Sequence, residues 1–459
     1  MKKHLRLAPI LGLAAFLAGC QGPCDKIETI SGPTLSNGTA DFTTYAAVGT
    51  SISAGWQSGG LVDRHQVHAF PALFATQIGK TVQLNGQGSF TLPTVDHDGQ
   101  PALLKIQSFS PLIISTAGQT AGAPENFSQN SAYHNMAVPG ALAFDFGDTS
   151  CYYTTNAPLF RTNFGMFNLI VRGRGSIAAQ AIGLGPTFLS MEYGANEVLG
   201  SATSGVSTLT FPSALFATIL TGAVNAIHAT LPGTKIALFT VPDVTAIPFF
   251  TTFPPFTFSL TTGTPVALIG PDGALAAGDL VTLPAAALLA TGQGFPVGSY
   301  NYVNPAAPGT GVALPNSVVL NVAEQTAIAG VTLGMNNAID SVCTRPFVAR
   351  VDLNQLLHDI STSGYRIGST RYTSAYITGG LFSLDGVHPN DLAHAIICNT
   401  MIDAVNLRFG STVPRVNPAD YATATASAAR PAMEREGMPS PVRVEGIETG
   451  LHALFPWRN

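Results

Sequence analysis

Five residues of this chain have side chains or backbone amides that together could cleave an ester bond. Ser51 could act as a nucleophile if His388 removed its proton, and Asp385, three residues before that histidine, could orient the ring. The backbone amides of Ser51 and Gly140 and the side-chain amide of Asn196 could donate hydrogen bonds to the oxyanion of acyl transfer. Ser51 and His388 lie near opposite ends of the chain, so a fold must bring them together.

Each of these segments also has a simpler structural interpretation. Small residues such as Gly49-Thr50-Ser51 after a strand are typical of a plain turn, and Pro139-Gly140 fits the two central positions of a type II turn. Asn196 could equally be a turn residue that follows a strand. The structural and the chemical interpretations are compatible, because turns are places where backbone amides point outward.

Aspartate and histidine three residues apart occur twice near the C-terminus. A glycine and a proline place the first pair, Asp385 and His388, in a loop, where the carboxylate can fold back onto the ring. Asp391 lies near the start of a predicted helix, where a carboxylate serves as a cap or dipole partner, and His394 lies inside that helix among apolar residues. The first pair is therefore the predicted catalytic pair, and His394 is predicted to be a packed or surface histidine.

An alternation of short apolar segments with segments of helical periodicity is expected to position these residues. Expected strands cover 42–48, 187–192, 235–241 and 347–353, and expected helices cover 70–78, 170–184, 213–231, 322–342 and 391–407. Such alternation predicts parallel βαβ units and a doubly wound α/β sheet. Ligands of these sheets bind beyond the carboxyl ends of the strands, where Ser51, Gly140, Asn196 and His388 are expected.

Two stretches lie outside this alternation. Residues 245–320 hold only two charged residues, Asp272 and Asp279, and are expected as an apolar insertion in a domain of residues 42–410. The insertion is rich in phenylalanine around residues 249–258, which could wall an acyl pocket or only pack as a cover over the core. Residues 411–459 are rich in Ala, Pro, Arg and Glu and are expected to form a C-terminal tail.

The N-terminus has the pattern of a bacterial lipoprotein signal. Lys2, Lys3 and Arg6 precede an apolar stretch that ends in Leu17-Ala18-Gly19-Cys20. This ending resembles the lipobox, which implies a signal peptide of residues 1–19, cleavage before Cys20 and lipidation of its thiol. Residues 20–41 are then a linker, and Gln21 favours the outer membrane of the cell envelope. An ordinary signal peptide with a chance cysteine is the alternative.

Composition and cysteine content restrict the class of protein. Hydrophobic residues form 46% of the chain and charged residues 10%, which provides a large core and leaves no basic surface for nucleic acid. Four further cysteines allow three disulfide pairings, among which the sequence does not decide: Cys24, Cys151, Cys343 and Cys398. Their spacing matches no zinc site. His65 and His68 near Asp63 could suggest a metal site, but without an evident third ligand a solvated loop is favoured.

Taken together, these segments resemble the four sequence blocks of the SGNH (also GDSL) hydrolase superfamily. The matching blocks are residues 48–51, 135–140, 194–197 and 385–389, in the family's order of serine, glycine, asparagine and histidine. The resemblance covers roughly residues 42–410. It implies a flavodoxin-like three-layer α/β/α fold, the triad and oxyanion donors given above, and catalysis without a metal or organic cofactor.

Two positions depart from the family pattern: Thr50 and Glu197 stand where its blocks usually carry aspartate. Neither position carries the nucleophile, the base or an oxyanion donor, so the resemblance still implies a serine esterase or lipase that forms an acyl-enzyme. The enzymatic alternative is a deacetylase of polysaccharide or peptidoglycan O-acetyl groups, and the alternative of another class is a non-catalytic surface-binding lipoprotein. The expected partners are an ester substrate (an acyl ester or an acetylated glycan) and the membrane, through the lipid anchor.

Overall fold

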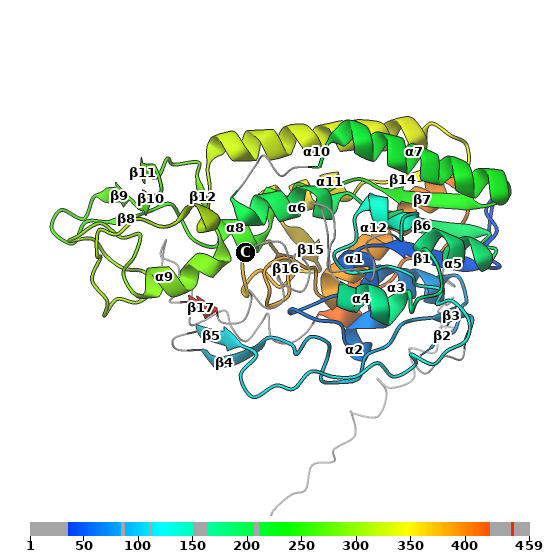
Figure 1. The fold of residues 1–459 in the computed structure, drawn as a ribbon, viewed down its shortest axis with the longest axis horizontal. Coiled ribbons are helices and arrows are strands. Elements are labelled where there is room, and N and C mark those ends of the chain that lie inside the picture. Colours follow the sequence, from blue (N-terminus) through cyan, green and yellow to red (C-terminus); the bar gives the residue numbers. More distant parts are fainter. Residues whose placement is uncertain are drawn as a thin grey trace, which may run out of the picture.

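A four-stranded parallel sheet lies at the centre of the molecule. The computed structural model describes residues 35–83, 88–109, 112–149, 164–205 and 211–422 and the backbone of 442–444. The expected signal peptide, Cys20, and most of the expected linker and tail lie outside these described residues. The strands of the sheet are, in spatial order, β1 (Tyr45–Gly49), β6 (Phe188–Glu192), β7 (Lys235–Phe239) and β14 (Val348–Val351) (Figure 1).

A short extended segment pairs with the free edge of β1. Asn135 forms a parallel bridge with Ala47, and the amides of Met136 and Val138 donate to the carbonyls of Ala47 and Gly49. With this segment counted as the second strand, the spatial order is 2-1-3-4-5, the doubly wound order of flavodoxin-like folds. The order reverses beside β1 and β6, so the carboxyl ends of these two strands form the crevice in which such sheets bind ligands.

Helices cover both faces of the sheet, because alternate residues of each strand point to opposite sides. Val48, Met191 and Leu238 belong to the hydrophobic cluster of one face, and Tyr45 and Phe188 to that of the other. The first cluster includes residues of α5 (Ile177–Gly183), α6 (Ala195–Ser204), α7 (Ser213–Thr230) and α10 (Val322–Cys343), and the second includes residues of α3 (Phe70–Gln77) and α12 (Asp391–Phe409). The predicted three-layer α/β/α sandwich is confirmed.

The expected helix over 170–184 is wrong at its start. α4 (Phe164–Ile170) ends where that helix was expected to begin, and α5 starts seven residues later, at Ile177. Gly173 and Gly175 lie between them with φ of 68° and 96°, a backbone conformation that ends a right-handed helix. Ser176 then caps α5, because its side chain accepts the amide of Ala179.

Helix α7 is long and apolar enough, by length and composition alone, to cross a membrane. In the structure it lies over the sheet beside α10 (Figure 1). Its buried residues recur at helical spacing and join the core: Phe216, Leu220, Val224 and Ile227. This pattern is that of an amphipathic surface helix, as the sequence predicts.

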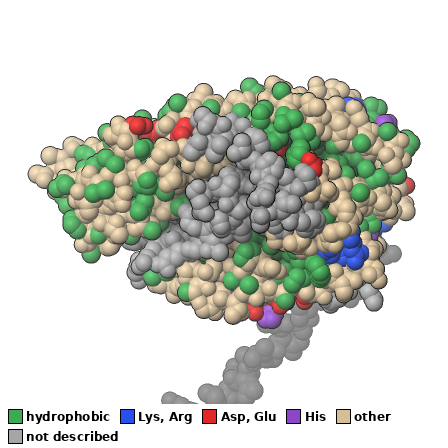
Figure 2. Space-filling view, in the orientation of Figure 1, with side chains coloured by type: hydrophobic (Ala, Val, Ile, Leu, Met, Phe, Trp, Pro, Cys, Tyr) green, Lys and Arg blue, Asp and Glu red, His purple; other side chains and the backbone are tan. Residues whose placement is uncertain are grey.

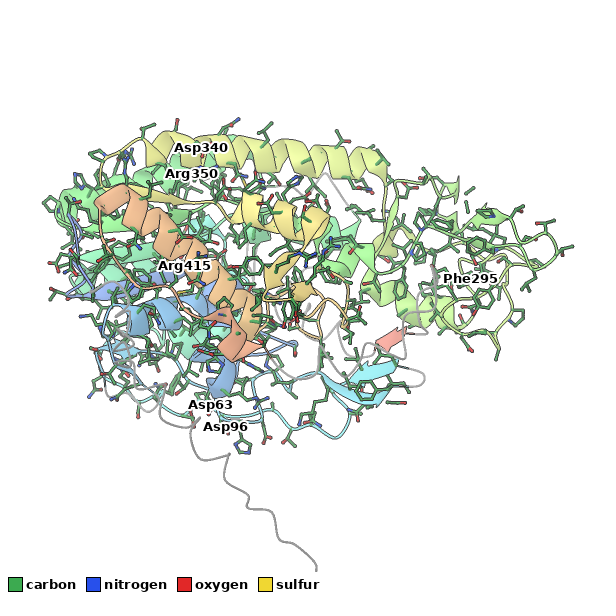
Figure 3. The ribbon with its side chains drawn as sticks, turned by 180° about the vertical axis from the view of Figure 1, so that it is seen from behind. Asp63, Asp96, Phe295, Asp340, Arg350 and Arg415 are labelled. Atoms are coloured by element: carbon green, nitrogen blue, oxygen red, sulfur yellow. The ribbon has the colours of Figure 1, made fainter. Side chains whose placement is uncertain are left out.

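Residues 244–320, between β7 and α10, form a lobe of short elements that extends from the sandwich (Figure 1). Phe295 is fully buried inside it and packs edge-on against Tyr302, with ring centroids 5.0 Å apart (Figure 3). The lobe contains α8 (Pro248–Thr251), β8 (Phe256–Phe258), β9 (Pro265–Ala267), β10 (Ile269–Gly270), β11 (Gly273–Ala274), β12 (Leu280–Val281), α9 (Ala286–Ala290) and β13 (Val319–Leu320).

Smaller elements surround the sandwich. Residues 36–39 lie against the end of α12, where the Thr39 amide donates to the Phe409 carbonyl at 2.8 Å. Charged side chains are sparse on the face that Figure 2 shows. The remaining elements are α1 (Ser51–Ala54), α2 (Asp63–Gln66), β2 (Val82–Gln83), β3 (Phe90–Thr91), β4 (Lys105–Phe109), β5 (Leu112–Ser115), α11 (Leu353–Ser363), β15 (Tyr365–Ile367), β16 (Thr370–Tyr372) and β17 (Val442–Val444), which pairs with β5.

Candidate active site

Ser51 is the first residue of α1 and lies just beyond the carboxyl end of β1. Thr50 before it is extended, and Gly55 after α1 has φ of 81°, so the chain turns sharply on both sides of the short helix. Gly49 has no room for a side chain, since a Cβ there would lie 2.5 Å from the Ser53 Oγ and 2.7 Å from the Glu192 carbonyl oxygen. The sequence Gly-Thr-Ser therefore forms a tight strand-to-helix turn, which we call the Ser51 turn (residues 49–54).

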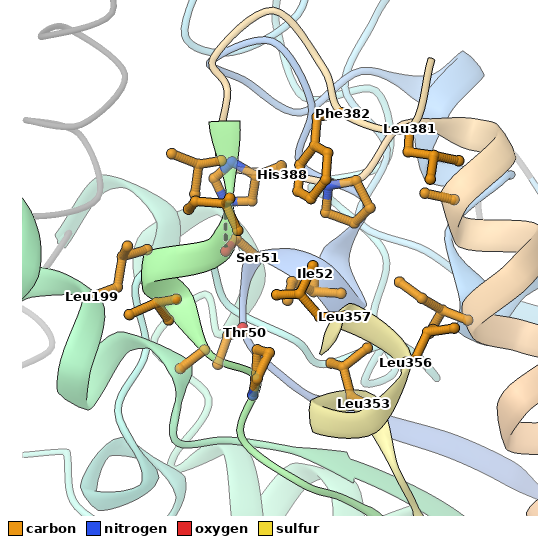
Figure 4. A pocket seen from close by; sticks show the side chains of 18 of the residues that line it. Thr50, Ser51, Ile52, Leu199, Leu353, Leu356, Leu357, Leu381, Phe382 and His388 are labelled. Carbon is orange, nitrogen blue, oxygen red and sulfur yellow. Dashed lines mark hydrogen bonds between the residues drawn. The ribbon is translucent and has the colours of Figure 1, made fainter. Parts of the chain in front are cut away.

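The structure brings Ser51, His388 and Asp385 into one chain of hydrogen bonds. The Ser51 Oγ lies 2.9 Å from His388 Nε2, and His388 Nδ1 lies 2.9 Å from Asp385 Oδ2 (Figure 4 shows the first contact). All three residues are buried, with 2–4% of their surface exposed. A carboxylate can only accept a hydrogen bond, so the His388 ring must carry its proton on Nδ1. The Nε2 atom then has a free lone pair that can accept the Ser51 proton.

The Asp385 carboxylate is buried but well satisfied. Burial alone would raise its pKa, but the charge and hydrogen bond of His388 and the amides of Val387 and His388 outweigh that effect and hold the pKa below its usual value. The Ser383 hydroxyl donates to the same carboxylate at 3.0 Å. Asp385 is therefore ionised around neutral pH and stabilises a positive charge on the ring.

A turn of residues 57–60 contacts the loop that carries the aspartate. The Gly59 amide donates to Asp385 Oδ2 at 3.1 Å, and the Ser58 amide donates to Ser383 Oγ at 2.9 Å. Ser58 has φ of 53°, a conformation that costs energy for a residue with a side chain. The turn thus orients the carboxylate from outside its own loop.

Gly140 lies in the turn that ends the segment beside β1. Its φ is 80°, and the Ala141 amide donates to the Val138 carbonyl at 3.0 Å, so Pro139-Gly140 has the features of a type II turn. The Val138 amide bonds Gly49, which places this turn next to the Ser51 turn. Within the described part of the chain, the amides of Ser51 and Gly140 have no acceptor, so both are available to an oxyanion.

Asn196 and Glu197, at the start of α6, bond the residues that follow Gly140. The Asn196 Nδ2 donates to the Ala141 carbonyl at 2.9 Å, which uses one of its two N–H bonds and leaves the other for a ligand. The Ala143 amide donates to Glu197 Oε1 at 2.7 Å. Burial raises the pKa of Glu197 to about 8, against the Ala143 hydrogen bond that lowers it, so this carboxyl is largely protonated at neutral pH.

A pocket opens beside the Ser51 and His388 side chains (Figure 4). Among the described residues, its polar lining consists of Thr50, Ser51, Asn196 and His388, and none of the lining residues is an Asp, Glu, Lys or Arg. Its apolar residues come from α1, α6, α11, α12 and the loops at the crevice: Ile52, Ala195, Leu199, Pro242, Val244, Ile247, Leu353, Leu356, Leu357, Ile360, Leu381, Phe382, Val387, Pro389, Ala393 and Ile397. Such a surface suits an apolar chain bound next to the hydroxyl.

The phenylalanines of residues 249–258 do not line this pocket. Phe249, Phe250 and Phe253 are buried in the core, and Phe256 is partly exposed on β8. The possibility that they wall an acyl pocket is therefore wrong, and the interpretation of a packed cover holds. The lobe contacts the loop that holds Asp385 and His388, because the Phe249 amide donates to the Gly386 carbonyl at 2.8 Å.

The second aspartate–histidine pair is separate. The Asp391 carboxylate bonds His65 Nδ1 at 2.8 Å, His68 Nδ1 at 2.9 Å and the Gln57 amide at 2.7 Å, which hold its pKa below the usual value although burial alone would raise it. His394 is fully buried, and neither ring nitrogen has a partner. Among the described residues, no group of His, Cys, Asp and Glu is arranged as a metal site.

Within the described part of the chain, Cys343 and Cys398 form no disulfide, and burial raises the pKa of each thiol. Cys24 and Cys151, and hence the disulfide pairings they could form, lie outside the described residues.

Sequence reasoning missed three parts of the site. Leu353, Leu357 and Ile360 recur at helical spacing after the Asp352 cap, and this periodicity could have predicted α11. Glu192 is a charged residue at the end of a predicted buried strand, which is a signal of its own. No local sequence pattern indicates that the 57–60 turn contacts the aspartate loop, since these contacts join residues 325 and 326 positions apart.

Comparison with known proteins finds no matching family model and no matching curated protein. Among solved structures, a GDSL-like lipase from Parabacteroides merdae matches with a TM-score of 0.34 and 12% identity, over 80% of this chain and 99% of its own. An extracellular lipase from Streptomyces rimosus matches with a TM-score of 0.34 and 12% identity, over 79% and 99%. A phospholipase A1 from Streptomyces albidoflavus matches with a TM-score of 0.30 and 13% identity, over 77% and 95%.

Proposed function

We propose that this protein is a serine hydrolase of the SGNH type that cleaves carboxylic esters with an apolar acyl chain. The proposal is supported by the two 2.9 Å hydrogen bonds that link Ser51 to His388 and His388 to Asp385. Ser51 and His388 also line an apolar pocket. A hydroxyl, a base and an orienting carboxylate in this order form the arrangement that activates a serine.

The reaction follows from the positions of these groups. The Ser51 Oγ attacks the ester carbonyl while His388 Nε2 takes its proton, and the amides of Ser51 and Gly140 with the Asn196 side chain bind the oxyanion. The C–O bond to the alcohol breaks as the imidazolium returns that proton to it, leaving an acyl-enzyme. Water, deprotonated by His388, then releases the acid and restores Ser51.

The pocket favours acyl esters over acetylated glycans. Each methylene buried in an apolar pocket contributes about 0.8 kcal/mol, so a longer acyl chain gains binding that an acetyl group lacks. A glycan, in contrast, needs polar groups around its hydroxyls, and the described residues of this pocket offer only the four polar side chains named above.

The test is hydrolysis of p-nitrophenyl esters from acetate to palmitate, with Ser51→Ala beside the wild type. We expect turnover that rises with chain length and is lost in Ser51→Ala. Turnover of acetate and acetylated xylan alone would favour the deacetylase. Folded protein that cleaves none of them would favour a non-catalytic binding lipoprotein.

We also propose that Cys20 carries the lipid that anchors the protein to a bacterial outer membrane. The support is the lipobox-like sequence Leu17–Cys20 with Gln21 after it. Cys20→Ala should abolish incorporation of labelled palmitate and release the protein from the membrane fraction. Equal labelling of the variant would refute the anchor.

A further inference from the structure

Glu192 is a buried carboxylate whose side-chain hydrogen bonds all lead to the Ser51 turn. Its Oε2 accepts the Thr50 amide at 3.1 Å, the Thr50 hydroxyl at 2.9 Å and the Ser53 hydroxyl at 3.0 Å, and its Oε1 lies 3.0 Å from the Thr50 hydroxyl. Thr50 and Ser53 flank the nucleophile on both sides. One side chain therefore ties the residues before and after Ser51 to the end of the neighbouring strand.

Burying the Glu192 carboxylate costs desolvation free energy, and in return the carboxylate provides acceptors that an apolar residue would lack. Only 2% of the Glu192 surface is exposed, and burial raises the pKa of its carboxyl to about 7, while the bonds from Thr50 and Ser53 lower it. An apolar side chain in the same place would carry no desolvation cost. It would also leave the Thr50 amide, the Thr50 hydroxyl and the Ser53 hydroxyl without their acceptor.

The Glu192 carboxylate also contacts a turn whose own sequence contains no acidic residue. Thr50 stands where the resembling block usually carries aspartate. In the structure a carboxylate does contact this turn, but it is that of Glu192 at the end of β6 and not that of a residue within the turn. Gly49 allows the close approach, because a Cβ there would collide with the Glu192 carbonyl oxygen.

We propose that Glu192 is a positioning residue for Ser51: it fixes the Ser51 turn so that the nucleophile and its amide keep their alignment. The inference rests on the proposed function. Glu192 does not line the pocket, so it acts through Thr50 and Ser53 rather than on the substrate. Loss of the carboxylate should therefore loosen the attack geometry while the acyl chain still binds.

The test compares Glu192→Ala with Ser190→Ala, a matched control on the same strand. Ser190 is buried and shares a 2.9 Å hydrogen bond with the Tyr45 hydroxyl, and within the described part of the chain its side chain forms no hydrogen bond with the Ser51 turn. Both variants lose one buried polar group from β6. We expect Glu192→Ala to lower kcat by up to about 10²-fold with KM within about twofold, as misplacement of a reacting group does. Ser190→Ala should change kcat by less than about threefold.

Two further variants separate positioning from folding. Glu192→Gln keeps the shape and one carbonyl acceptor, so it should recover much of the kcat lost in Glu192→Ala. If Glu192→Ala fails to fold, Thr50→Val removes one donor of the same group at nearly constant volume, and a fall in kcat without a change in KM is again expected. Reaction of Ser51 with a fluorescent phosphonate should slow in parallel with kcat.

Equal kcat in Glu192→Ala and Ser190→Ala, or an unchanged phosphonate rate in folded Thr50→Val, would overturn the inference. A rise in KM at constant kcat would also overturn it. Wild-type protein that neither cleaves esters nor reacts with the phosphonate would refute the proposed function itself, so the two failures are distinguishable.

Discussion

The Nδ1 atom of His388 lies 2.9 Å from the Oδ2 atom of Asp385, a carboxylate three residues earlier in the same loop. The other oxygen, Oδ1, accepts the amides of Val387 and His388, each at 2.9 Å. The loop thus folds around its own carboxylate and presents the far side of the imidazole to Ser51. Orientation and protonation of the base are set together by one side chain.

Asp385→Asn should lower kcat by about 10³–10⁴-fold, because an amide can donate to Nδ1 and so stabilise the wrong tautomer of His388. Asp391→Asn is the matched control, since Asp391 precedes His394 by the same spacing and lies outside the pocket. It should alter stability more than kcat. Steady-state kinetics of both variants on one ester measures the difference, and similar losses of kcat would contradict the assignment.

Asn196→Ala should lower kcat by about 10²–10³-fold with little change in KM, because it removes an oxyanion donor. Asn399→Ala is a fair control: Asn399 is buried and donates its side-chain amide to the Val416 carbonyl at 2.9 Å, as Asn196 does to Ala141. Asn196→Ala loses one buried hydrogen bond within the protein, and Asn399→Ala loses two, because Asn399 Oδ1 also accepts the Val416 amide at 2.8 Å. If kcat fell equally in the two, Asn196 would have only a structural role.

Leu357→Trp should shift chain-length preference towards short esters, since the larger side chain fills part of the apolar pocket. A buried methylene contributes about 0.8 kcal/mol, so kcat/KM of the wild type should rise by up to about fourfold per methylene until the pocket is full. In the variant this rise should stop at a shorter chain while acetate is still cleaved. Leu333→Trp, at an exposed position of α10, should leave the profile unchanged. A uniform loss at all lengths would argue against an acyl pocket here.

Glu197→Gln should flatten the dependence of stability on pH between about 5 and 8. Burial raises the pKa of Glu197 from the ordinary range of a glutamate to about 8, so between these values the folded chain keeps a proton that the unfolded chain loses. This contribution is complete below the unfolded pKa and is lost as pH rises through the folded pKa. Urea unfolding at pH 5, 6.5 and 8 measures the slope. A wild type and variant with the same slope would show that Glu197 is ionised in the folded state.

His394→Leu should stabilise the protein, and more at pH 5 than at pH 8. Burial lowers the pKa of His394 to about 3, and both ring nitrogens lack partners, which costs about 1–3 kcal/mol per unsatisfied group. Because the folded pKa is depressed, stability is present above the unfolded pKa of about 6.5 and is lost as pH falls towards the folded pKa. Thermal unfolding at both pH values checks this, with the exposed His358→Leu as control. A lower Tm at pH 5 would contradict it.

The sequence was sufficient for most of the sandwich. Periodicity is a local property, so β7, α7 and α12 begin at the predicted residues and β6 begins one residue later, and each ends within two residues of its predicted end. The error at 170–184 arose where two glycines interrupt an apolar pattern that otherwise continues. α11 was missed because its apolar spacing begins at Leu353, which the sequence analysis assigns to the predicted strand 347–353, although β14 ends at Val351.

The site was only partly predictable, and the reason is physical. The order of the four blocks selects Ser51, Gly140, Asn196 and His388, because each block has its own local signal. Glu192 and the 57–60 turn act through contacts 139 to 326 positions apart, and no local pattern encodes such a partner. The acyl pocket likewise combines α1, α6, α11 and α12, which only the assembled sheet brings together.

The chain order of the catalytic groups has a consequence for biosynthesis. Ser51 and the 57–60 turn emerge from the ribosome together. Asp385 emerges 326 positions after Gly59, and His388 emerges 337 positions after Ser51. Under the proposed function, the Ser51 hydroxyl therefore has no base until the loop of Asp385 and His388 has been synthesised and has docked against the Ser51 turn. Activation of this serine then requires the folded domain, and a partly synthesised chain would have no esterase activity.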